Sequence, residues 1–161
     1  MPATVVIDSG PLVALFDKDD RYHAAALRFI QRLRGRAVCN LAVVTEVAYL
    51  LDSSRQAQLD FLQWVRDGAL VLIELEATDW DRILELLRKY ADRPMDFTDA
   101  TLVTLCERSG TRDVASVDSD FSIYRFQNRH PFRNLFFDDL VCQRCAWDCS
   151  QRPLEFSVQQ S

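Results

Sequence analysis

Several acidic side chains stand where a folded chain could bring them together, although they lie far apart in the sequence. Asp8 ends the apolar run TVVID, and Asp118 ends the run DVASVD. If both runs are strands of a parallel sheet, their carboxyl ends open onto one crevice, which is where such sheets bind ligands. The two positions predict a polar site at this edge of a sheet, although a strand-to-helix cap explains Asp8 equally well by itself.

A third acid, Glu46, stands in LAVVTEVAYLL, where only it and Thr45 are polar. A helix of this composition is expected to be buried, and an unpaired carboxylate there is costly or takes up a proton. Glu46 therefore requires a positive partner. Both an arginine and a metal ion would meet this requirement.

Two further acids, Asp96 and Asp99, open the segment PMDFTDATLVTLCE and fall on one helix face, since three residues make nearly a full turn. Aspartates at a helix start accept backbone N–H bonds, so this pattern also predicts an N-terminal cap. Asp96 is the better cap and Asp99 the better metal ligand. A set of carboxylates of this kind favours Mg²⁺ or Mn²⁺ over zinc.

Alternating apolar patterns define the elements that must position these acids. They predict strands at 4–8, 36–40, 69–75, 113–118 and 133–137, and helices at 9–16, 20–35, 41–51, 55–68, 78–90, 96–110 and 120–126. The alternation predicts an α/β fold with a central parallel sheet of about five strands, covered by helices on both faces. Helical spacing predicts these core-facing stripes: Leu59, Leu62 and Val65; Trp80, Ile83, Leu84 and Leu87; Ala24, Leu27, Ile30 and Leu33.

The length of 161 residues, the 48% hydrophobic content and the low count of 4 Gly and 5 Pro predict one compact domain. We expect this domain to span residues 1–140 and a tail to span 141–161, where the periodicity fades. Cys142, Cys145 and Cys149 in the tail supply only three zinc ligands, which favours free thiols over a structural zinc. We find neither a membrane-spanning run nor a signal peptide, so we expect a cytoplasmic protein.

Net charge does not decide between partners. The formal charge of −5 weakly opposes nucleic-acid binding. However, if six of the 24 acids form one site, the other 18 face 19 basic side chains, and the remaining surface is about neutral. The basic residues are arginines except for Lys18 and Lys89, and arginine suits phosphate oxygens well.

Four segments, VVIDSGPLVALF, VVTEVAYLL, MDFTDATLVTLCE and ASVDSDFSIYR, together resemble the PIN domain, and especially the VapC-like toxins of bacterial toxin–antitoxin pairs. The resemblance covers roughly residues 4 to 137. It implies a metal-dependent endoribonuclease that hydrolyses RNA phosphodiester bonds, with one or two Mg²⁺ or Mn²⁺ ions. It also implies a small antitoxin partner and a homodimer.

Carried over residue by residue, the resemblance places the catalytic and metal-binding quartet on Asp8, Glu46, Asp99 and Asp118, with Asp96 and Asp120 as additional ligands. Hydroxyl positions beside the quartet, expected to hydrogen-bond to the acids or to bound water, are Thr45, Ser116 and Ser9. RNA is expected to be held by arginines and by stacking on aromatic rings. The positions expected to contact RNA are Tyr124, Arg125, Arg129 and Arg133, with Arg28 and Arg32 as a second group.

Two other functions compete with this interpretation. An aspartyl phosphatase also begins with an apolar strand that ends in aspartate, but it needs a second aspartate where this chain has Gly10. A non-catalytic PIN-like module that binds RNA or protein is the stronger alternative. Such a module has no need for four buried or half-buried carboxylates, so the intact quartet opposes it.

Overall fold

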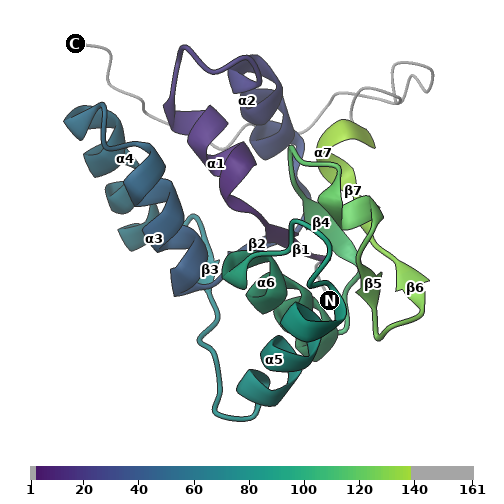
Figure 1. The fold of residues 1–161 in the computed structure, drawn as a ribbon. Coiled ribbons are helices and arrows are strands. Elements are labelled where there is room, and N and C mark those ends of the chain that lie inside the picture. The colour runs from purple at the N-terminus through teal and green to yellow at the C-terminus, as the bar shows by residue number, and fades with distance from the viewer. Residues whose placement is uncertain (1–2, 139–161) are drawn as a thin grey trace.

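The computed structural model describes residues 3–138, in which strands and helices alternate (Figure 1). In chain order the elements are β1 (Thr4–Ile7), α1 (Ser9–Phe16), α2 (His23–Arg32), β2 (Arg36–Cys39), α3 (Leu41–Leu50), α4 (Arg55–Arg66), β3 (Val71–Leu72), α5 (Asp79–Lys89), α6 (Phe97–Ser109), β4 (Asp113–Ala115), η1 (Asp120–Ser122), β5 (Arg125–Phe126), β6 (His130–Pro131), β7 (Arg133–Asn134) and α7 (Leu135–Asp138). The predicted α/β class is confirmed. The predicted boundary after residue 140 and the three tail cysteines lie outside the described residues.

The main sheet has five parallel strands in the order β3-β2-β1-β4-β7. In register, Val6 of β1 lies between Val38 of β2 and Val114 of β4. The chain lays down β1, β2 and β3 in one direction and then returns to place β4 on the other side of β1. The carboxyl ends of β1 and β4 therefore flank the point where strand order reverses, and ligands bind at such a point in open α/β sheets.

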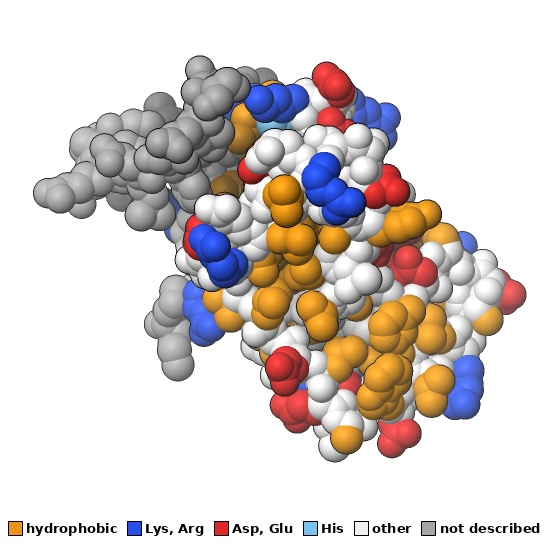
Figure 2. Space-filling model, turned by 90° about the vertical axis from the view of Figure 1, so that its left-hand side faces the viewer, with side chains coloured by type: hydrophobic (Ala, Val, Ile, Leu, Met, Phe, Trp, Pro, Cys, Tyr) orange, Lys and Arg blue, Asp and Glu red, His pale blue; other side chains and the backbone are white. Residues whose placement is uncertain are grey.

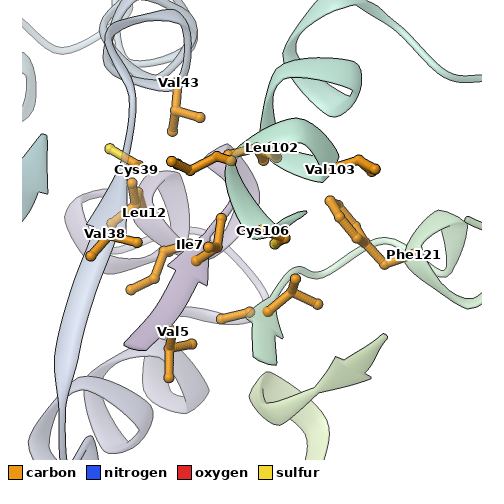
Figure 3. Packing of buried hydrophobic residues seen from close by; sticks show 14 of the residues in the cluster. Val5, Ile7, Leu12, Val38, Cys39, Val43, Leu102, Val103, Cys106 and Phe121 are labelled. Carbon is orange, nitrogen blue, oxygen red and sulfur yellow. The ribbon is translucent and has the colours of Figure 1, made fainter. Parts of the chain in front are cut away.

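Helices cover the sheet on both sides. Figure 1 shows α1 and α2 on one side, α5 and α6 on the other, and α3 and α4 beside the edge strand β3. Every residue of α6 from Ala100 to Cys106 is buried, which makes α6 the central helix of its layer. Figure 3 shows its side chains Leu102 and Cys106 packed close to Ile7 of β1. This packing fixes the start of α6 relative to the end of β1.

A hairpin follows β4 where the sequence predicted a helix over 120–126. The structure has a single 3-10 turn, η1, and then the antiparallel pair β5 and β6. The turn between these strands places Gln127 and Asn128 at positive φ, 49° and 59°. The backbone N–H of Gln127 donates to Glu107 Oε1 at 2.7 Å, and Lys89 Nζ donates to Asn128 Oδ1 at 2.8 Å. These long-range hydrogen bonds select the hairpin, and the local pattern of residues 120–126 does not contain them.

The predicted core stripes of three helices are only partly correct, because Ile83 is buried and Ile30, Leu33, Val65 and Leu87 pack against the core while their other members do not. On α4, Phe61 is fully buried, whereas Leu59 is 52% exposed. On α5, Ile83 and Leu86 face the core. The remaining differences are that Leu62, Trp80, Leu84, Ala24 and Leu27 are exposed, and that Ala26 and Phe29 are the buried residues of α2. Each helix is rotated about its axis relative to the prediction, so part of each predicted stripe faces outward.

Helix α3 is also less buried than its composition predicts. Tyr49 is 73% exposed, and Leu41 and Leu50 are exposed as well. Together with Leu59 and Leu62 of the neighbouring α4, these side chains form what we call the apolar outer face. Figure 2 shows apolar side chains gathered on this side of the molecule. None of the described helices is both long and apolar enough to cross a bilayer.

Candidate active site

Asp8 is the most buried of the four predicted site acids, with 6% of its surface exposed. It follows β1 directly, and its backbone N–H continues the ladder by donating to the carbonyl of Ala115 in β4 at 3.0 Å. Its side chain caps α1, since Oδ1 accepts from the Ser9 N–H at 2.7 Å. Its Oδ2 accepts from Ser116 Oγ, also at 2.7 Å. Both oxygens of this carboxylate are therefore oriented by the protein.

A glycine brings the start of α1 close to the segment that follows β4. A Cβ atom built on Gly10 would lie 2.2 Å from the side chain of Val117, a distance that real structures do not tolerate. A side chain at this position would force either the Val117 side chain or the first turn of α1 to shift. Gly10 thus allows Asp8 and Asp118 to share one edge of the sheet.

Glu46 reaches the same edge from α3. Its Oε1 accepts from Ser9 Oγ at 3.1 Å, so the hydroxyl next to Asp8 holds Glu46. The side chain is half-buried, in contrast to the fully buried position that the sequence predicted. Ser9 therefore links α1 and α3, as expected for a hydroxyl beside the quartet.

Asp96 and Asp99 form a reciprocal cap at the start of α6. Asp96 Oδ1 accepts from the Asp99 N–H at 2.8 Å, and Asp99 Oδ2 accepts from the Asp96 N–H at 3.3 Å. This capping box satisfies two backbone donors at the helix end. Asp99 Oδ2 also accepts from the hydroxyl of Tyr124 at 3.0 Å. Asp96 is thus the cap, as predicted, and Asp99 has an additional partner from outside its helix.

Ser116 connects Asp118 to Asp8 after the end of β4. Its Oγ donates to Asp8 Oδ2 and accepts from the Asp118 N–H at 3.1 Å. Asn134 of β7 fixes the Ser116 backbone, because its Oδ1 accepts from the Ser116 N–H and its Nδ2 donates to the Ser116 carbonyl. Ser116 is fully buried, whereas Asp118 is exposed. Solvent exposure of the acids along this edge thus increases from the buried Asp8 to the exposed Asp118.

Burial and mutual repulsion raise the pKa values of two of these acids. Burial is the larger cause for Asp8, and with the charges of Glu46 and Asp118 it raises the pKa to about 6. Burial likewise raises the pKa of Asp99 to about 7, with contributions from the charges of Asp96 and Asp8. The four predicted acids thus act on one another electrostatically through Asp8.

An arginine partner was the main competitor to a metal ion, and the structure does not provide one. Among residues 3–138, the ion pairs involve Arg66, Arg82, Arg108 and Arg133, and none of them reaches the quartet. Within the same residues, no three acidic, His or Cys side chains lie close enough to form a ready-made metal site. The donor chemistry therefore fits a divalent ion, whereas the side chains stand further apart than ligands bound to one ion.

Two predicted members of the site have other environments. Thr45 is exposed, and its Oγ1 donates to the Leu41 carbonyl one turn back in α3, so the predicted contact with the acids is wrong. Thr45 and Glu46 are consecutive and so lie about 100° apart around the helix. Asp120 is the first residue of η1, whose N-cap is Ser119, and its charge acts on the Tyr124 phenol that donates to Asp99.

The predicted RNA contact from Tyr124 is wrong, and Arg133 lies away from the acids. Tyr124 is fully buried, so its ring is not available to stack on a base. The Arg133 guanidinium pairs with Asp113 at the amino end of β4, whereas the acids follow the carboxyl end of that strand.

The other predicted RNA contacts have more varied surroundings. Arg125 is half-buried, and its Nη1 donates to the carbonyls of Ser122, Ile123 and Tyr124. Arg129 is exposed in the hairpin turn. Arg28 and Arg32 lie exposed on α2.

Asn40 is a positioning residue that the sequence analysis missed. It follows β2, is buried, and caps α3 by accepting from the Val43 N–H. Its Nδ2 donates to Thr101 Oγ1 of α6 at 2.9 Å. Asn40 thus ties the helix of Glu46 to the helix of Asp99. The signal was present, because an asparagine between an apolar run and a helix is a typical N-cap.

The structure is thus a parallel α/β sheet with carboxylates gathered at its topological switch point, which is where sheets of this class bind ligands. The PIN domain family model matches residues 5–127, and the chain belongs to this family. The predicted resemblance to VapC-like PIN proteins is confirmed.

Two relatives of the chain come from Mycobacterium tuberculosis. Ribonuclease VapC26 (strain ATCC 25618 / H37Rv) is 29% identical over 116 residues, which cover 71% of this chain and 86% of VapC26. The crystal structure of VapC20, a toxin that cleaves the sarcin-ricin loop, has a TM-score of 0.71 and 21% sequence identity. It covers 79% of this chain and 99% of VapC20. At this identity the VapC20 likeness establishes the fold.

Proposed function

We propose that the protein is a metal-dependent endoribonuclease that hydrolyses RNA phosphodiester bonds as the toxin of a toxin–antitoxin pair. The observation that carries this proposal is Asp8, a buried carboxylate at the switch point with three acidic neighbours and no basic partner among the described residues. Membership of the PIN domain family and the ribonuclease relative VapC26 support the same conclusion.

Asp8, Glu46, Asp99 and Asp118 would hold Mg²⁺ or Mn²⁺, with Asp96 and Asp120 at the margin. A divalent ion bound there supplies a water of lowered pKa and a positive charge next to the scissile phosphate. The chain itself keeps the ligands oriented, since the Ser116 and Ser9 hydroxyls donate to Asp8 and Glu46. Asp118 is exposed, which leaves its side chain room to move toward the buried Asp8.

RNA would approach the exposed side of this edge, where Asp96 and Asp118 lie. Arg129 of the hairpin and Arg28 and Arg32 of α2 are exposed and suit phosphate contacts. Arg125 has a smaller role in this proposal, because its Nη1 is occupied by three backbone carbonyls.

The apolar outer face suits a partner protein, because exposed apolar side chains gathered on two helices typically mark an interface. We assign it to the antitoxin, with a homodimer as the second expected assembly. An apolar segment of the antitoxin laid across α3 would pass close to Glu46 and so to the acids. A cytoplasmic location follows from a substrate and a partner of this kind.

The test is cleavage of a structured RNA by the whole chain, with Mg²⁺ and with a chelator. Asp8→Asn and Asp99→Asn remove one charge each, and we expect both to lower the cleavage rate by more than about 100-fold, since even residues that merely orient metal ligands cost 10- to 100-fold. Asp60→Asn is the matched control, because Asp60 is an exposed acid on α4 whose partner is Gln56.

Cleavage that is indifferent to the chelator and to both site variants would contradict the proposal. RNA binding without any metal uptake would instead favour a non-catalytic PIN-like module.

A further inference from the structure

Tyr124 has a buried hydroxyl, and its role cannot be the RNA contact that the sequence predicted. Its surface is fully buried, between η1 and β5, yet its hydroxyl reaches Asp99 Oδ2 at 3.0 Å. A phenol carries its proton at neutral pH, so the hydroxyl acts as the donor and the carboxylate oxygen as the acceptor. The partner is one of the four acids at the edge of the sheet.

The two oxygens of Asp99 have different environments. Oδ2 accepts two hydrogen bonds, from the Asp96 N–H and from the Tyr124 hydroxyl. Within residues 3–138, no hydrogen bond reaches Oδ1. Two donors on one oxygen fix the rotation of the carboxylate and leave the other oxygen available for a ligand.

We propose that Tyr124 is a positioning residue whose hydroxyl fixes the Asp99 carboxylate so that Oδ1 is presented to the divalent ion. The inference rests on the proposed metal-dependent function. Hydrogen bonds from the protein commonly orient metal ligands in this way, and they raise affinity by removing rotations that do not allow binding.

The surroundings of Tyr124 hold its hydroxyl in place. Its ring makes edge contacts with Tyr90 and Phe121, at centroid distances of 5.2 and 5.5 Å. Arg125 ties its backbone carbonyl, and the Gln127 N–H is bound to Glu107. A ring held by two aromatic neighbours, on a backbone that is itself hydrogen-bonded, keeps its hydroxyl at Asp99. The β5–β6 hairpin thus helps to position Asp99, the proposed metal ligand, although Asp99 belongs to α6.

The experiment compares Tyr124→Phe with wild type in the whole chain, by titration with Mn²⁺ followed by electron paramagnetic resonance. The variant keeps the ring and removes only the hydroxyl. We expect the dissociation constant for Mn²⁺ to rise by about 10-fold or more. In cleavage assays, kcat should fall while KM for RNA stays within about two-fold, because the buried hydroxyl does not touch the substrate.

Tyr90→Phe is the matched control. Tyr90 is a second buried phenol in contact with Tyr124, and within the described residues its hydroxyl has no hydrogen-bond partner. This variant should bind Mn²⁺ as wild type does. Circular dichroism in chelator should show both variants folded at the assay temperature.

The possible outcomes separate this inference from the proposed function. If wild type binds Mn²⁺ and Tyr124→Phe binds it equally well, the positioning role is overturned and the ribonuclease proposal stands. If Tyr124→Phe does not fold, the hydroxyl serves the fold alone, which also overturns the inference. If wild type itself takes up no Mn²⁺, the proposed function fails and the inference fails with it.

Discussion

The acidic edge of the sheet and the apolar outer face of α3 and α4 differ in how the chain builds them. At the edge, side chains from β1, α3, α6 and the segment after β4 converge, and hydrogen bonds orient the carboxylates. On the outer face, Tyr49, Leu59 and their neighbours point away from the core and contact little of the chain. Within residues 3–138, the edge holds several carboxylates with no basic partner, and the apolar outer face is not covered by other side chains.

The chemistry of each region indicates the kind of group that would stabilise it. Carboxylates that repel one another in a buried setting call for a cation. Exposed apolar side chains call for another apolar surface. The comparison teaches that the proposed reaction site and the proposed partner surface lie mostly on different elements of the fold. Helix α3 contributes to both, through Glu46 and Tyr49.

The largest effect is expected on stability, for a substitution on the buried side of α4 compared with one on its exposed side. Phe61 is fully buried against Phe16, so Phe61→Ala should lower the free energy of unfolding by about 3–5 kcal/mol. Leu59→Ala, on the exposed side, should change it by less than about 0.5 kcal/mol. Denaturant unfolding measures both. Equal losses would show that Leu59 is covered in solution and would break the comparison.

A smaller effect is expected from charging the outer face. Tyr49→Lys places a charge at its most exposed side chain and should weaken binding of the antitoxin by about 2 kcal/mol, or roughly 30-fold. The partner is sought as the product of the adjacent gene, and calorimetry gives the affinity. Ser109→Lys adds the same charge at an exposed polar position at the end of α6, outside the apolar outer face, and is the control. RNA cleavage should persist in both variants. Loss of cleavage with Tyr49→Lys would show that the outer face is also needed for cleavage, which contradicts the comparison.

The smallest effect concerns stability and pH without metal. Burial raises the pKa of folded Asp99 from 3.8 to about 7, so the folded chain binds more protons than the unfolded chain between these values. Its contribution to the free energy of unfolding therefore falls as pH rises through this window. Asp99→Asn keeps an acceptor for Tyr124 and for the Asp96 N–H but removes the charge.

In chelator at pH 8, Asp99→Asn should be more stable than wild type by on the order of 1–2 kcal/mol, after allowance for partial exposure of the group. The difference should vanish near pH 4. Added Mn²⁺ should reverse the order by stabilising wild type. Asp52→Asn, at an exposed turn position, should show neither change. A variant that is less stable than wild type at pH 8 would indicate that the edge carries no strain from buried charge.

The acidic edge could be predicted from the sequence because topology fixes it. Asp8 and Asp118 follow apolar runs, and parallel strands bring such positions to one edge whatever the side-chain packing. The family assignment and the parallel sheet are accordingly confirmed, and the endoribonuclease expectation agrees with the family and its ribonuclease relative. The roles of the individual acids stay predictions.

The outer face could not be predicted in the same way. Helical periodicity identifies an apolar stripe, but it does not say whether the stripe faces the core or a partner. Leu59 and Leu62 match a core stripe in spacing, yet the buried residue is Phe61, directly before Leu62. Tyr124 was misassigned for a related reason, since a tyrosine among arginines suggests a base-stacking ring when its long-range partner Asp99 is not known.

A crystal of the whole chain soaked in Mn²⁺ tests the central claim most directly, through the anomalous signal of the ion. We predict a peak bounded by Asp8, Glu46, Asp99 and Asp118, lost in an Asp8→Asn crystal. A soaked crystal with no peak among these four acids, or with an arginine guanidinium in its place, would contradict the claim.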